Sequence, residues 1–203
     1  LSFISKIFKS SNDIELAKFP EGGLDLVSLW QAGFREVAAA YQQADPSDRV
    51  SWVGPSMSAR SSITARQMET WAHGQAIADE LGIERSEDDR IRNIVILGVN
   101  TFGWSFMVRG MEVPEDQPAL RLTSPSGESW EYGNPDSDQV ISGMAHEFAQ
   151  VVTQTRNIAD TQLVCEGDTA ELWMRNAQCF AGAAAEPPAP GVRRTKSPGL
   201  SLI

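Results

Sequence analysis

Three helices are predicted in the first half of the chain, because apolar residues recur there at spacings of three and four. The first covers residues 24–44 and ends before a proline, which disfavours helix in the residue preceding it. The second covers about residues 58–81 and stops at Gly82, a glycine suited to a helix C-terminus. The third begins at about residue 86 with a capping-box pattern and ends near residue 110. Three helices joined by short connections predict an antiparallel bundle.

The second half of the chain mixes strand and helix patterns. Apolar residues alternate on both sides of a Ser-Pro-Ser-Gly turn and predict a β-hairpin within residues 120–132. An apolar stripe over residues 140–152 predicts a helix, and residues 162–165 are a short candidate strand. A last helix is expected from Asp168, with Glu171 as its capping partner, to Gly182.

The fold class is therefore predicted to be α+β, with a helical part followed by a small α/β part. We expect the helical bundle over residues 1–112 and the α/β domain over residues 113–182, separated by a linker rich in proline and acidic residues. Residues 183–203 are rich in alanine, proline and glycine and are expected to be disordered.

Composition and charge narrow the class of protein. Of 203 residues, 41% are hydrophobic and 22% charged, which is typical of a soluble globular chain. The net charge of −10 makes nucleic acid an improbable partner, and no run approaches the roughly 18 apolar residues of a membrane span. The opening residues are too short for a signal-peptide core, so a cytoplasmic location is expected. Cys165 and Cys179 cannot form a disulfide framework and are expected to be small buried hydrophobes.

The candidate chemistry lies in the second predicted helix. Glu69 and His73 are four residues apart and therefore share a helix face, which continues into Ile77 and Leu81. A carboxylate and an imidazole that point toward a core need partners, and a divalent cation such as zinc binds both groups. A surface Glu–His pair, worth a few tenths of a kcal/mol, is the alternative interpretation.

Two longer segments carry a family resemblance. Residues 52–59 read WVGPSMSA, and residues 64–75 read TARQMETWAHGQ. Together they resemble a bacterial family whose metal-binding, DinB-like N-terminal domain is related to mycothiol-dependent maleylpyruvate isomerase. The resemblance covers about residues 24–182 and implies a DinB/YfiT-like antiparallel bundle. The C-terminal part resembles the segment labelled "wyosine base formation", which is similar to part of a tRNA-modifying enzyme.

The resemblance also implies a metal held by three protein ligands. Glu69 and His73 match two of them, while the family's early histidine has no counterpart in this chain. Since the sequence begins at Leu1 rather than Met, we expect an N-terminally truncated member whose third ligand lies upstream. The other histidine, His146, lies off its helix's apolar stripe and is expected to face solvent. Without the opening helix pair, the bundle is expected to expose apolar surface or to form a homodimer.

The function implied is that of a metal-dependent thiol transferase or isomerase. The metal would bind the sulfur of mycothiol, and the thiolate would add to an electrophilic substrate. Arg66, Trp52 and Met57 are the candidates for binding substrate or thiol. A surface arginine explains Arg66 equally well, and packing is the more common role of aromatic and Met side chains beside a turn, as Trp52 and Met57 are.

Two other functions remain open on the sequence. One is a non-catalytic metal- or ligand-binding module that keeps the scaffold. The other is a role in tRNA modification, which the net charge and the lack of an iron–sulfur cysteine triplet oppose. Arg156 and Asp160 form a further candidate pair, to which we assign no role.

Overall fold

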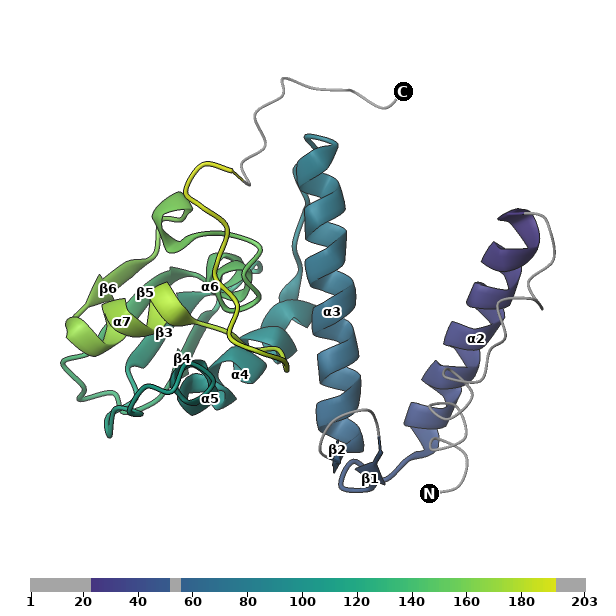
Figure 1. Ribbon diagram of the computed structural model, residues 1–203, viewed down its shortest axis with the longest axis horizontal. Helices are drawn as coiled ribbons and strands as arrows, with labels where there is room; N and C mark the ends of the chain where they lie inside the picture. Colours follow the sequence, from purple (N-terminus) through teal and green to yellow (C-terminus); the bar gives the residue numbers. More distant parts are fainter. Residues whose placement is uncertain (1–22, 52–55, 193–203) are drawn as a thin grey trace. The chain divides into compact units, whose positions relative to one another are not determined.

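The computed structural model of the chain describes residues 23–51 and 56–192 (Figure 1). It divides into two compact units, Leu1–Thr64 and Ala65–Ile203. The described part contains both helices and sheets, which confirms the α+β class. The DinB-like bundle and the domain boundary near residue 112 stay predictions.

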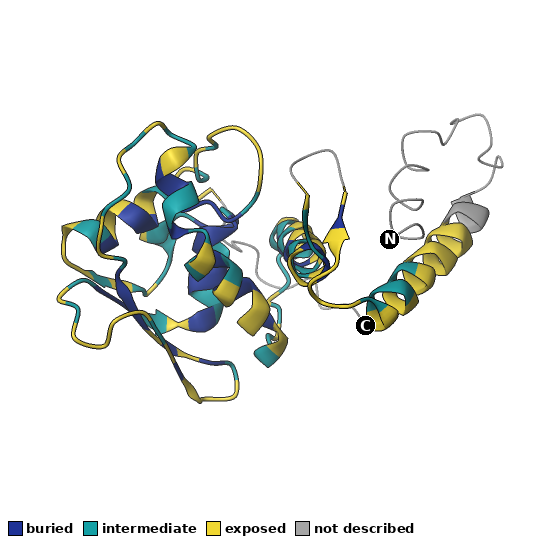
Figure 2. Cartoon of the chain, turned by 90° about the horizontal axis from the view of Figure 1, so that it is seen from below, coloured by how far each residue is buried: buried dark blue, intermediate teal, exposed yellow. Residues whose placement is uncertain are grey.

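The first unit consists of a long helix followed by a small β-ribbon. Helix α2 (Gly23–Gln43) confirms the predicted helix over residues 24–44. Strands β1 (Arg49–Val50) and β2 (Met57–Ser58) pair antiparallel and lead into helix α3 (Ala59–Glu80). Much of α2 is exposed in Figure 2. Its exposed residues include large apolar side chains, namely Val27, Leu29, Trp30 and Phe34.

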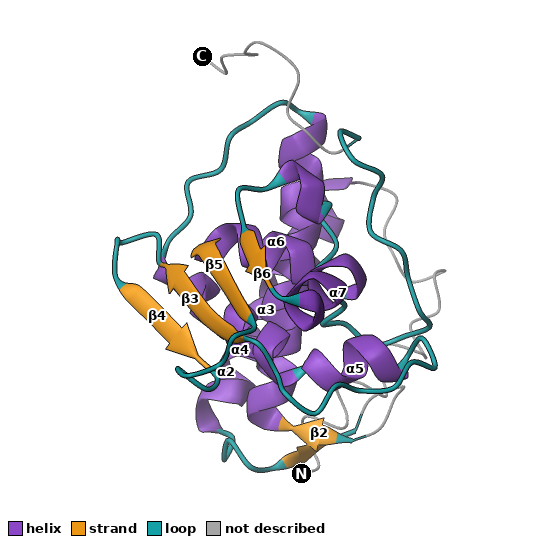
Figure 3. Ribbon diagram, turned by 90° about the vertical axis from the view of Figure 1, so that its left-hand side faces the viewer, coloured by secondary structure: helices purple, strands orange, loops and turns teal. Residues whose placement is uncertain are grey.

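The second unit is built on a four-stranded sheet with strand order β4-β3-β5-β6. The strands are β3 (Ala119–Thr123), β4 (Ser129–Tyr132), β5 (Val140–Met144) and β6 (Val164–Glu166). Strands β3 and β4 form the predicted antiparallel hairpin, whereas β5 runs parallel to β3. Figure 3 shows this sheet in front of helices α4 and α6.

The core of this unit lies between the sheet and its helices. These helices are α4 (Arg92–Asn100), α5 (Phe102–Met107), α6 (Ala145–Val152) and α7 (Asp168–Asn176). Trp173 is fully buried, and its ring meets those of Phe102 and Phe148 edge-on at 4.9 and 5.7 Å between centroids. A Cβ atom on Gly98 would lie 2.9 Å from atoms of Phe148 and Val152, so glycine permits the close approach of α4 and α6.

The predicted third helix is interrupted. A 3-10 turn, Asp89–Ile91, precedes α4, and Thr101 separates α4 from α5 with φ −102° and ψ 17°. The Thr101 hydroxyl donates to the carbonyls of Leu97 and Gly98, a side-chain bond that competes with the helical pattern. The prediction of one continuous helix was therefore wrong, although its apolar residues are correctly placed in the core.

Residues 140–152, predicted to form one helix, form a strand followed by a helix. Residues 140–144 form β5, and only residues 145–152 are helical. Gly143 has φ +139°, a conformation that favours glycine and that does not continue a right-handed helix. Pairing of β5 with both β3 and β6 satisfies its backbone groups instead.

The C-terminal segment is more ordered than its composition predicts. The last helix ends at Asn176 rather than at Gly182. Residues 183–192, expected to be disordered, are described and held by hydrogen bonds, while residues 193–203 lie outside the described part. Arg109 and Gln154 both donate to the carbonyl of Ala185, and the Gly191 amide donates to the Asp160 carboxylate at 2.8–2.9 Å.

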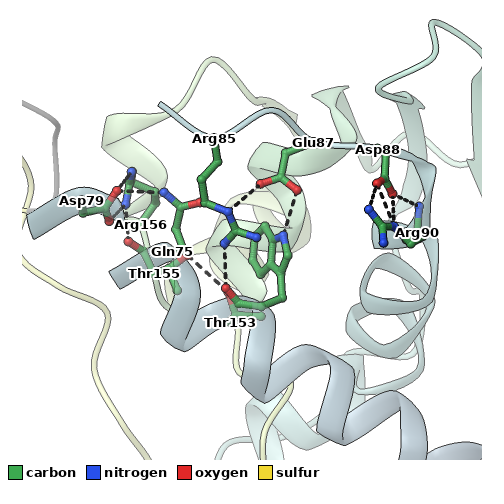
Figure 4. A network of polar contacts seen from close by, with 10 residues as sticks. Gln75, Asp79, Arg85, Glu87, Asp88, Arg90, Thr153, Thr155 and Arg156 are labelled. Carbon is green, nitrogen blue, oxygen red and sulfur yellow. Dashed lines mark hydrogen bonds and ion pairs between the residues drawn. The ribbon is translucent and has the colours of Figure 1, made fainter. Parts of the chain in front are cut away.

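Helix α3 confirms the predicted helix over residues 58–81. Within the second unit, a buried ion pair joins its last turn to the loop after α6 (Figure 4). Asp79 accepts two hydrogen bonds from Arg156, and the side chains are only 6% and 10% exposed. The Gln75 amide donates to Asp79 at 2.8 Å. The expected pair between Arg156 and Asp160 is thus wrong, because each residue has a different partner.

We predict that Asp79→Ala lowers the free energy of unfolding by about 3–5 kcal/mol, because it leaves the Arg156 guanidinium buried without its carboxylate. The matched control is Glu171→Ala, which removes an exposed i,i+4 pair with Arg175 worth about 0.5 kcal/mol or less. Urea unfolding followed by circular dichroism measures both. Equal effects of the two substitutions would contradict the structural role of the buried pair.

Candidate functional site

The candidate site occupies one turn of α3. The Glu69 Oε2 and His73 Nε2 atoms lie 3.4 Å apart, as expected for residues at i and i+4 of a helix. The two side chains are 55% and 81% exposed. They point toward each other at the surface of the unit, so the spacing argument holds but the environment differs from the expected one.

The face that carries this pair does not point toward the core. Ile77 and Leu81, which continue the stripe, are 62% and 51% exposed. The buried residues of α3 lie on another face of the helix, and in the second unit they are Met68, Trp71, Gln75 and Ala78. The sequence-based prediction selected the wrong one of two apolar stripes, because both satisfy helical spacing.

The exposed stripe forms an open, mainly apolar depression next to His73. It is lined by His73, Ala76, Ile77, Glu80 and Leu81. The imidazole therefore borders an exposed, mainly apolar strip of α3.

The separation of the two donor atoms suits a metal ion. Zinc binds imidazole nitrogen and carboxylate oxygen at about 2.0–2.2 Å, and two such atoms at a tetrahedral angle are about 3.4 Å apart. The same separation also suits the exposed ion pair that the sequence left as the alternative. Glu69 and His73 thus provide two fitting donors, which is half of a tetrahedral set.

A third ligand is not found within residues 23–51 and 56–192. No group of three or more His, Cys, Asp or Glu side chains is placed there to hold a metal. The full sequence has one histidine besides His73, which is His146 on α6. Its side chain is half-buried, whereas the sequence predicted that it faces solvent. His146 does not form such a group with Glu69 and His73.

The residues predicted to bind substrate or thiol do not gather around Glu69 and His73. Arg66 is exposed on α3, three residues before Glu69. Met57 is half-buried in strand β2 of the first unit, and Trp52 lies outside the described residues. The structure therefore brings together Glu69 and His73, with Arg66 on the same helix.

Sequence reasoning missed a polar network on the buried side of α3 (Figure 4). The Trp71 indole donates to Glu87 at 2.9 Å, while Arg85 donates to the Trp71 carbonyl at 2.9 Å and lies over its ring. Trp71 was part of the family-like segment, but its partners follow 14 and 16 positions later in the chain and have no local signal. These contacts fix the rotation of α3 and hence the direction in which Glu69 and His73 point.

The two cysteines are poor nucleophiles. Burial raises the pKa of the Cys165 thiol to about 11, and the Glu171 carboxylate adds to this effect. Burial also raises the pKa of Cys179, which is 5% exposed. These environments agree with the expected role as small buried hydrophobes.

Comparison with protein families identifies one match. Residues 12–78 match the family described as "Mycothiol maleylpyruvate isomerase N-terminal domain". The match covers about a third of the chain and includes Glu69 and His73. The resemblance of the C-terminal part to the wyosine segment stays a prediction.

Two curated relatives are similar over a longer region. Both are described as uncharacterized proteins, from two strains of Mycobacterium tuberculosis, and each is 41% identical over 134 residues. The alignment covers 66% of this chain and 52% of each relative, so the chain spans about half the length of the curated relatives it matches. No solved structure matches the chain significantly. None of the described helices has the length and hydropathy needed to cross a bilayer.

We predict that His73→Ala changes the free energy of unfolding by no more than about 0.5 kcal/mol, because the side chain is exposed. Trp71→Ala, two residues earlier on the buried face, is expected to cost about 3–5 kcal/mol. Thermal and urea unfolding of both variants in the presence of a chelator measure the difference. A large loss of stability on His73 substitution would mean that this face is covered after all.

We also predict that both thiols react slowly with iodoacetamide or an aromatic disulfide in the native chain at pH 7.5. Because burial raises the pKa of Cys165 to about 11, less than about 1% of this thiol is ionised at that pH. Labelling after denaturation provides the control and should modify both residues within minutes. Rapid labelling of either cysteine in the native chain would contradict the raised pKa of Cys165 or the burial of Cys179.

Proposed function

We propose that the chain binds a divalent metal ion, with zinc as the expected metal, through Glu69 and His73. On this basis it acts with a small thiol of the mycothiol type as a transferase or isomerase. The observation that carries the proposal is the 3.4 Å separation of Glu69 Oε2 and His73 Nε2 on one helix face. The family match over residues 12–78 supports it, because that family's description names mycothiol and an isomerase.

The residues have distinct roles in this proposal. His73 binds as the neutral imidazole through Nε2, and the Glu69 carboxylate offsets part of the cation's charge. A bound zinc ion would stabilise the thiolate of a small thiol near neutral pH. The high exposure of both ligands leaves room for a thiol and an electrophile on the solvent side.

Substrate contacts are proposed from the same face. The apolar depression of Ala76, Ile77 and Leu81 covers the carbon skeleton of the electrophile. Arg66 is proposed to bind an anionic group of the thiol or the substrate, because a guanidinium matches a carboxylate in charge and geometry. The chain's own cysteines do not act as the nucleophile, since Cys165 is half-buried, Cys179 is buried, and both thiols have raised pKa values.

A second candidate function is a non-catalytic module that binds metal or ligand on the same scaffold. It is favoured by one observation, the lack of a third ligand beside Glu69 and His73 among the described residues. Thiol consumption against a panel of electrophiles distinguishes the two functions. Zinc binding without any thiol turnover above background would favour the module.

We predict that calorimetric titration shows zinc binding to the chain and that His73→Ala weakens it about 100-fold, since one of two protein ligands is lost. The matched control is His146→Ala, which removes the only other histidine and should leave the affinity unchanged. Equal zinc affinity of the chain and the His73 variant would rule out the proposed site.

A further inference from the structure

A row of polar side chains in the second unit holds the backbone of the C-terminal segment. The members of this docking row come from the turn after α5, the loop after α6, the 3-10 turn that follows it and the stretch after α7. Each of them makes a hydrogen bond to a backbone carbonyl or amide of residues 183–191. They are Arg109, Gln154, Asn157, Asp160 and Gln178. The row therefore binds groups that every peptide presents.

The bound backbone groups recur at intervals of three residues. They belong to Ala185, Pro188 and Gly191, and the Pro188 carbonyl accepts its hydrogen bond from Asn157 at 2.9 Å. These three residues are half-buried, as is residue 187, while residues 186, 189 and 190 are exposed. A polyproline II helix has three residues per turn, so residues at this spacing lie along one side of it.

The sequence of the segment favours the same conformation. Residues 185–191 read AEPPAPG. Each proline fixes its own φ near −65°, and each residue before a proline is restricted to extended backbone. Residues 186–190 are therefore held close to polyproline II geometry even when they are not docked. A segment of this kind loses little conformational entropy when it binds.

The backbone of Gln154 supports a recognition role for its side chain. Among the described residues it is the one non-glycine position with positive φ, at 55°. It follows α6 in a helix end at which glycine is the usual residue. Glycine would lack the side-chain amide, which donates to the carbonyls of Ala177 and Ala185 at 3.0 and 2.8 Å. The unfavourable conformation thus positions a donor for the segment.

The attachment of the segment rests on hydrogen bonds rather than on apolar burial. None of residues 181–192 is buried, so docking covers little apolar surface. Each hydrogen bond makes only a modest net contribution, because water replaces it when the segment detaches. Such a segment opens locally more readily than the core does, which leaves the docking row accessible to another peptide.

We propose that the docking row binds a proline-rich segment of a partner protein, and that residues 185–191 occupy the row within the same molecule. The partner presents two backbone carbonyls three residues apart and an amide three residues further on, in polyproline II geometry. Its side chains matter less than its prolines, because the row contacts backbone groups. This inference is independent of the proposed metal site, since no member of the row lies on α3.

The test is the binding of a fluorescein-labelled peptide of residues 183–192 to the complete 203-residue chain, followed by fluorescence anisotropy. The unchanged chain should bind it weakly, because its own segment competes. Replacing Pro187, Pro188 and Pro190 of the chain with glycine loosens that segment and should tighten peptide binding about tenfold or more, since each proline restricts the free segment. Adding Gln154→Ala and Asn157→Ala to this variant should weaken binding about tenfold or more.

The matched control is a peptide of the same length with glycine in place of its three prolines, which should bind about tenfold or more weakly. Equal affinity of the two peptides overturns the proposal, as does a loosened chain that binds no more tightly than the unchanged one.

A second measurement needs no variant and decides the matter if the loosened chain loses its circular dichroism. Unlabelled peptide at millimolar concentration should speed hydrogen exchange of the Gly191 amide in the unchanged, ¹⁵N-labelled chain, because it displaces the residue from Asp160. An exchange rate that the peptide does not alter overturns the proposal.

Discussion

Helix α3 has apolar residues on two faces, and burying one of them exposes the other. The rest of the structure depends on this constraint. With 3.6 residues per turn, Met68 and Trp71 can be buried only if Glu69 and His73 point elsewhere. The Asp79–Arg156 pair fixes the same rotation, because it ties the last turn of the helix to the loop after α6. The exposure of the candidate ligands therefore follows from the packing of the opposite face.

Most local elements of the fold could be predicted from the sequence, because periodicity and turn residues carry them. Helices α2 and α3 and the β3–β4 hairpin are found where the pattern places them. Strand β5 could not be predicted, since its apolar run fits a helix and a strand equally well. What decides it is parallel pairing with β3 and the positive φ of Gly143, neither of which has a local signal.

The candidate site, like the fold, could be predicted from the sequence only in part. The spacing of Glu69 and His73 predicted their proximity, because neighbours at i and i+4 follow from helix geometry alone. Their orientation could not be predicted, because α3 has apolar residues on two sides and the covered side is selected by remote partners such as Glu87 and Arg156. A similar limit applies to the C-terminal segment, whose polar partners lie on several distant elements.

The C-terminal segment, residues 183–191, extends the folded unit beyond its last helix. Gln178 is 1% exposed, and its side-chain amide is satisfied by backbone groups of Ala183 and Ala185, as is part of the Arg109 guanidinium. The backbone of this stretch therefore takes the place that water would otherwise occupy around buried polar groups. Removing residues 183–191 would leave the buried Gln178 amide and part of the Arg109 guanidinium without these hydrogen-bond partners, so the folded unit extends past its last helix.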